Sequence, residues 1–135
     1  MSREASSKLS PVWARWYRRA LPTYWIFLFC VTHFPKLSLG PLAPRNTDKL
    51  AHFVAFGLLA FVYWRFNESF GRPVSSRFVW AATLLLSAYA ALDEYLQQFV
   101  NRSPGVGDWL ANVAGIVTVL AVFEIRRRRS ASEEA

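Results

Sequence analysis

The sequence predicts an all-α integral membrane protein in which four transmembrane helices form a bundle. Three observations predict this class. Hydrophobic residues make up 53% of the 135 residues, and six Trp and eleven Phe are among them, which is more apolar surface than a soluble domain of this length easily buries. The apolar residues gather in runs separated by turn-forming residues. Basic residues flank these runs, so the net charge of +7 reports membrane topology rather than nucleic-acid binding.

The first helix is expected over residues 17–34. Its apolar residues run from Pro22 to His33, which is short for a span of about 20 residues, so the helix is expected to start further back, at Tyr17. The polar segment before it mixes Arg, Trp and Tyr, as is typical of a chain that approaches a bilayer surface. Phe34-Pro35-Lys36 follows where a signal peptide would need small residues for cleavage, so this helix is expected to stay uncleaved.

Two further helices are expected over residues 48–66 and 78–99. Asp48 lies in the first turn of the former, where a negative charge complements the positive helix end. The polar segment 67–77 between them contains Gly and Pro, which end helices. The later helix carries no charge as far as Leu92, and such a run is typical of a membrane span.

The fourth helix is expected over residues 108–125. Turn-forming residues precede it, and the four consecutive arginines 126–129 are expected to stop it. The predicted domain organisation is a basic cytoplasmic tail over 1–16, a transmembrane domain over 17–126 and a polar cytoplasmic tail over 127–135.

Lys and Arg are unevenly distributed between the two ends of these helices. Twelve of the sixteen lie in residues 1–19, 65–77 and 126–129, and the other four lie in 34–49 and 100–108. Because basic residues favour the cytoplasmic side, both termini of this multi-pass protein are expected in the cytoplasm. The helix ends that carry most of the remaining polar residues then face outward.

The candidate functional residues lie at these outward-facing helix ends. An acidic pair in a membrane helix usually faces a partner or a water-filled cavity, and Asp93-Glu94 closes a charge-free run. A spacing of four residues places further polar side chains on shared helix faces. The candidate catalytic residues are Asp93, Glu94 and His52, and the candidate substrate-binding residues are Asp48, Lys49, Gln97, Arg102, Asp108 and Asn112.

A purely structural role is one reading of these residues. Polar groups inside a membrane can tie helices together, each interhelical hydrogen bond contributing about 0.6 to 2 kcal/mol. Asp48 can serve only as a helix cap, and Lys49 can extend toward lipid headgroups. Arg102 can be a loop charge with no partner, or it can clamp an anionic group through two parallel hydrogen bonds.

Three functional readings are also open. The carboxylates can bind a divalent cation, with oxygen ligands favouring magnesium or calcium and His52 favouring zinc. Alternatively, Asp93 or Glu94 can act as a general acid or base, because burial beside a second carboxylate raises a carboxyl pKa. The site can also bind a polar headgroup without any reaction. The residues alone leave these alternatives open.

The order of these residues resembles the VanZ-like family of small bacterial membrane proteins. The resemblance covers residues 47–117 and is carried by Asp48-Lys49, His52-Phe53, Phe56-Gly57, Asp93-Glu94, Gln97, Arg102, Asp108, Asn112 and Gly115. Asn101 stands where the family often has glycine, and an additional Pro-Gly precedes Asp108. The resemblance implies a protein of the cell envelope, located in the bacterial inner membrane. The family is named for a member that gives low-level resistance to the glycopeptide antibiotic teicoplanin.

These observations together predict a polar pocket that binds or modifies a lipid-linked glycan, a peptidoglycan precursor or a glycopeptide. Asp93 and Glu94 are expected to act as the acid/base or ligand pair with His52 and Asp48 as partners, while Arg102 binds an anionic group. Expected partners are membrane lipids and no nucleic acid. The alternative is a non-enzymatic membrane scaffold whose polar cluster is structural. A small proton-coupled transporter is a third reading, which would require oligomerisation.

Overall fold

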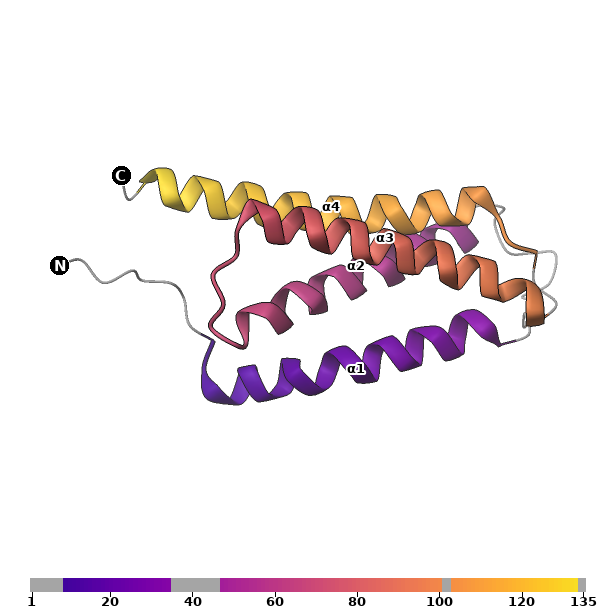
Figure 1. Ribbon diagram of the computed structural model, residues 1–135, viewed down its shortest axis with the longest axis horizontal. Coiled ribbons are helices and arrows are strands. Elements are labelled where there is room, and N and C mark those ends of the chain that lie inside the picture. Colours follow the sequence, from indigo (N-terminus) through magenta and orange to yellow (C-terminus); the bar gives the residue numbers. More distant parts are fainter. Residues whose placement is uncertain (1–8, 35–46, 101–102, 134–135) are drawn as a thin grey trace.

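The computed structural model describes residues 9–34, 47–100 and 103–133, and within them the predicted all-α bundle is confirmed. The described residues form four α-helices and one short 3-10 helix, namely α1 (Pro11–His33), α2 (Thr47–Glu68), α3 (Ser76–Leu96), η1 (Gln97–Val100) and α4 (Val106–Glu133). The helices run alternately in opposite directions. The ends of α1 and α3 and the beginnings of α2 and α4 therefore share one end of the bundle (Figure 1).

The first helix is longer at its beginning than the sequence predicted. It starts at Pro11 rather than at residue 17, because the side chain of Ser10 caps it by accepting a hydrogen bond from the Trp13 N–H at 3.5 Å. Pro11 occupies the first turn, where a residue without an N–H costs nothing. Pro22 consequently lies inside the helix and not near its start.

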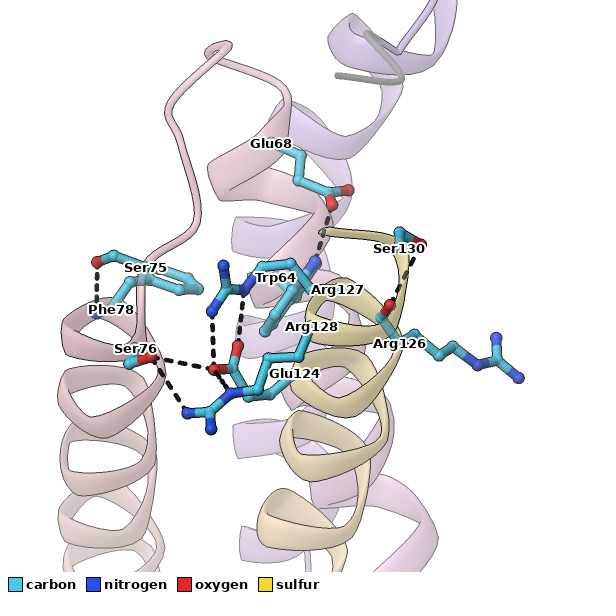
Figure 2. Close-up of polar contacts among 10 residues, drawn as sticks. All are labelled: Trp64, Glu68, Ser75, Ser76, Phe78, Glu124, Arg126, Arg127, Arg128 and Ser130. Atoms are coloured by element: carbon cyan, nitrogen blue, oxygen red, sulfur yellow. Dashed lines mark hydrogen bonds and ion pairs between the residues drawn. The ribbon is translucent and has the colours of Figure 1, made fainter. Parts of the chain in front are cut away.

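The fourth helix continues through the four arginines to Glu133, so the expectation that residues 126–129 stop it is wrong. The reason is an ion-pair cluster around Glu124. Arg127 and Arg128 approach its carboxylate at 2.8 and 2.7 Å, at the spacings that stabilise helices. Ser76 of α3 donates to the same carboxylate at 3.1 Å, which joins the two helices (Figure 2).

The contact between α2 and α4 depends on close approach of their backbones. A Cβ atom added to Gly115 would overlap the carbonyl oxygen of Phe53 and lie 3.0 Å from the backbone nitrogen of Gly57. Small residues allow this approach in helix pairs. On the other side, the Tyr24 hydroxyl of α1 donates to the Ala55 carbonyl of α2 at 2.9 Å. The fully buried core side chains between the helices include Phe56, Leu59, Leu86 and Ile116.

Two of the helices, α2 and α4, are long and apolar enough to cross a membrane. In the other two, charged residues shorten the apolar segment: Arg15, Arg18 and Arg19 in α1, and Arg77, Asp93 and Glu94 in α3. Large apolar side chains nevertheless point outward along the bundle, such as Ile26, Leu84 and Leu92. Extensive apolar surface of this kind is unusual in soluble monomers and marks contact with a partner or a membrane.

Candidate functional site

Polar residues from all four helices meet at one end of the bundle, where α1 and α3 end and where α2 and α4 begin (Figure 1). Most of them are buried although they are polar or charged, and such groups need hydrogen-bonding partners. We refer to the following residues as the polar end: Thr32, His33, Asp48, His52, Asp93, Glu94, Gln97, Asp108 and Asn112.

Asp93 is fully buried and lies in the last turn of α3. Its Oδ1 atom accepts hydrogen bonds from the Thr32 hydroxyl at 3.0 Å and from the Tyr89 hydroxyl at 3.4 Å, and Nδ1 of His33 lies 3.7 Å from the same atom. Its Oδ2 atom accepts from Nε2 of Gln97 at 3.4 Å. Both oxygens are thus engaged, and the carboxylate joins α1 to α3.

Glu94 holds the start of the fourth helix. Its Oε1 atom accepts a hydrogen bond from the backbone N–H of Gly105 at 2.8 Å, and its Oε2 atom accepts from Nε2 of Gln97 at 3.3 Å. The carbonyl of Gly105 in turn accepts from the backbone N–H groups of Asp108 and Trp109, each at 3.0 Å. Glu94 therefore positions the first turn of α4, on which Asp108 lies.

A second group of polar side chains spans α2 and α4; we refer to Asp48, His52, Asp108 and Asn112 as the α2–α4 cluster. The His52 ring is buried, with Nδ1 lying 3.0 Å from Oδ1 of Asn112 and Nε2 lying 4.0 Å from Oδ1 of Asp48. One ligand atom from each of Asp48, His52 and Asp108 lies within 4.8 Å of the others. This is the donor set of a candidate metal site.

The predicted site residues contact other partners than expected, because Asp93 and Glu94 were expected to contact His52 and Asp48. Asp93 and Glu94 contact Thr32 and Gly105, whereas His52 contacts Asn112. Lys49 is exposed and extends past the start of α4, where a Cβ atom on Gly107 would lie 3.4 Å from its Nζ atom. Arg102 lies outside the described residues, so its expected role as an anion clamp stays a prediction.

The sequence reasoning missed the polar residues that α1 contributes. Nδ1 of His33 lies 2.9 Å from the Phe29 carbonyl, its ring stacks on Phe29 with 4.0 Å between ring centroids, and its buried Nε2 has no hydrogen-bond partner among the described residues. A signal was present, because Thr32 and His33 end an otherwise apolar run. Like Asp93-Glu94, a polar pair at the end of an apolar run predicts side chains that face a partner or a cavity.

An apolar groove lies directly beside the Asp93 network. It is lined by Pro22, Trp25, Ile26, Phe29 and Tyr89. The Tyr89 ring packs edge-on against Trp25 with 4.9 Å between centroids, while its hydroxyl bonds to Asp93. Phe29 of α1 also lines the groove, and its ring stacks on His33 of the same helix. The groove therefore borders the polar end, because two of its lining residues, Tyr89 and Phe29, contact Asp93 and His33.

The model of the VanZ/LLP1 family matches residues 3–127 of this chain. The chain therefore belongs to the VanZ/LLP1 family, as the order of its polar residues indicated. Family membership and the apolar helices α2 and α4 together support a VanZ-like protein of the cell envelope. Comparisons with curated proteins and with solved structures gave no match.

Proposed function

We propose that this protein binds a lipid-linked component of the cell envelope, such as a lipid-linked glycan or peptidoglycan precursor. The apolar chain of the ligand would lie in the groove between Trp25 and Tyr89, and its headgroup would lie against the polar end. The observation that carries this proposal is the continuity of the two surfaces. Tyr89 lines the groove with its ring and bonds to Asp93 with its hydroxyl.

The chemistry of the polar end supports a polar, hydrogen-bonding headgroup. Nε2 of His33 and Nδ2 of Asn112 are buried without a partner among the described residues, and a buried polar atom without a partner costs free energy that a ligand can recover. Lys49 adds an exposed positive charge beside the start of α4. A glycopeptide antibiotic such as teicoplanin could bind to the same groups, and it is a second ligand to test.

Binding is the activity that the geometry supports best. A modifying enzyme that used Asp93 or Glu94 as acid or base would need one of them within reach of a substrate. In the structure both oxygens of Asp93 accept bonds from Thr32, Tyr89 and Gln97. For this carboxylate to act on a substrate, some of those hydrogen bonds would have to break and be replaced by contacts with the substrate.

The proposed orientation places the polar end at the outer face of the inner membrane. Twelve of the sixteen Lys and Arg lie in residues 1–19, 65–77 and 126–129, so the positive-inside rule supports cytoplasmic termini. Two termini on one side agree with the proposed four membrane passes. A headgroup exposed at the outer face of the membrane could then reach the polar end. The orientation and the proposed ligand class therefore agree.

A groove-filling variant tests the proposal. Ile26 lines the groove and is 66% exposed, whereas Val31 is 52% exposed on another face of the same helix. In lipid nanodiscs, we expect the parent protein to bind a polyprenyl-pyrophosphate-linked peptidoglycan precursor, measured by native mass spectrometry. Ile26→Trp should weaken binding about tenfold, equivalent to about 1.4 kcal/mol, and Val31→Trp should not. Equal binding by both variants, or no binding by the parent, would contradict the proposal.

A non-enzymatic scaffold is the second candidate, and the saturated hydrogen bonding of Asp93 favours it. In that case the polar end only joins the four helices, and the protein acts by contacting a partner protein. This candidate predicts that neither the precursor nor teicoplanin binds the parent protein, although substitutions at Asp93 still destabilise the fold.

A further inference from the structure

We propose that Asp48, His52 and Asp108 form a binding site for a divalent transition-metal cation of the zinc type. The site lies where α2 and α4 begin, and each residue offers one ligand atom within 4.8 Å of the other two. Donor atoms around zinc lie about 2.0–2.2 Å from the ion when they are nitrogen or oxygen. Neither aspartate is fully buried, so rotation of the two carboxylates can close this distance around an ion.

The histidine is oriented as a metal ligand should be. Its Nδ1 lies 3.0 Å from Oδ1 of Asn112, and the amide oxygen can only accept, so Nδ1 carries the proton. Nε2 then keeps its lone pair and lies on the side of Asp48, 4.0 Å from Oδ1. Metal-binding histidines almost always donate their second ring nitrogen to an oxygen in this manner, which fixes both tautomer and ring orientation.

A second observation at the site points to a further ligand. Asn112 is fully buried, lies one helical turn after Asp108, and its Nδ2 has no hydrogen-bond partner among the described residues. A buried donor without a partner can bond to a further polar group that enters the cluster, such as a water molecule or a phosphate oxygen. The side chain of Asp48 is 47% exposed, so ions can enter from outside the bundle.

The donor set discriminates between cations. One imidazole nitrogen with two carboxylates suits zinc and related transition ions, whereas calcium takes six to eight oxygen ligands and magnesium keeps several waters. Three protein ligands also leave at least one coordination position open, which is typical of sites that act on or bind a further group rather than of purely structural ones. The inference does not depend on the proposed lipid ligand, because the metal alone is the probe.

Zinc titration of the purified protein tests the inference. The protein in detergent is first stripped with a chelator, and Zn²⁺ alone is then added in a calorimeter. We expect one ion per chain, with Asp108→Asn and His52→Ala each weakening binding at least about tenfold. Glu133→Gln, which removes a carboxylate from the far end of the same helix, should bind as the parent does. Co²⁺ should give the visible absorption of a low-symmetry site in the parent and lose it in Asp108→Asn.

The melting temperature of each stripped variant separates loss of the site from loss of the fold. If Asp108→Asn does not fold, Asp48→Asn replaces it, because this side chain is half-exposed. A parent that binds no Zn²⁺, variants that bind it as tightly as the parent, or Ca²⁺ binding of equal strength would each overturn the inference. Loss of lipid binding with intact Zn²⁺ binding would contradict only the proposed function.

Discussion

At the scale of single residues, Asp93 shows how a buried charge is accommodated in an apolar bundle. Three donors, from Thr32, Tyr89 and Gln97, surround its carboxylate, and the ring of His33 lies close by. Because Thr32 and Gln97 are buried, loss of the hydrogen bonds that they donate to this carboxylate would be costly. We therefore expect this carboxylate to stabilise the fold, whatever its neighbourhood binds.

Asp93→Asn tests this reading. The NH₂ group of the new amide would replace one oxygen that now accepts from Thr32 or Gln97. Two donors would then face each other, and a buried polar group would lose its partner. We expect the free energy of unfolding to fall by about 1–3 kcal/mol, measured as thermal unfolding in detergent with lipid. Asp48→Asn, at a half-exposed position, is the control and should change stability less. Unchanged or increased stability of Asp93→Asn would instead mean that the charge is kept for function at the expense of stability.

At the scale of secondary-structure elements, the α2–α4 pair is the framework on which the candidate metal site is built. The pair shares the close approach at Gly115 and Gly57, and its first turns carry Asp48 and Asp108. Since both aspartates lie at the beginnings of their helices, a change in the crossing of α2 and α4 moves the two carboxylates relative to each other. Packing in the middle of the helices thus controls the geometry at their ends.

Gly115→Ala tests the helix contact. Its new Cβ atom would collide with the Phe53 carbonyl of α2, and backbone cannot move aside as a flexible side chain can. We expect a loss of about 1–3 kcal/mol or more in the free energy of unfolding. Gly57→Ala is the matched control, because its Cβ would lie 3.4 Å from the nearest atom, the Gly115 carbonyl oxygen. Similar melting temperatures for the two variants would show that the helices do not approach as closely as described.

At the scale of the whole molecule, the helices could be predicted from the sequence better than the contacts between them. Apolar runs and turn residues indicated four helices, and the i to i+4 spacing placed Asp108 and Asn112 on one face. The rotation of α1 about its own axis has no such local signal, so the contact of Thr32 with Asp93 was not predicted. The four charges of arginines 126–129 predict the end of a helix, but Glu124 forms ion pairs with two of them, and the helix continues.

The arrangement of the whole molecule in the membrane is the last prediction. The arginines 126–129 extend α4 at one end of the bundle, and the polar end lies at the other (Figure 1). Moving the arginine-rich end across a membrane is costly, so the polar end should face outward.

In a Cys30→Ala background, Ser103→Cys should react with a membrane-impermeant maleimide in intact spheroplasts. Ser132→Cys, at the opposite end of α4, should react only after lysis. Both positions are exposed, so labelling of both in lysed cells controls for reactivity. The reverse pattern would put the polar end in the cytoplasm, where an outer-face precursor could not reach it.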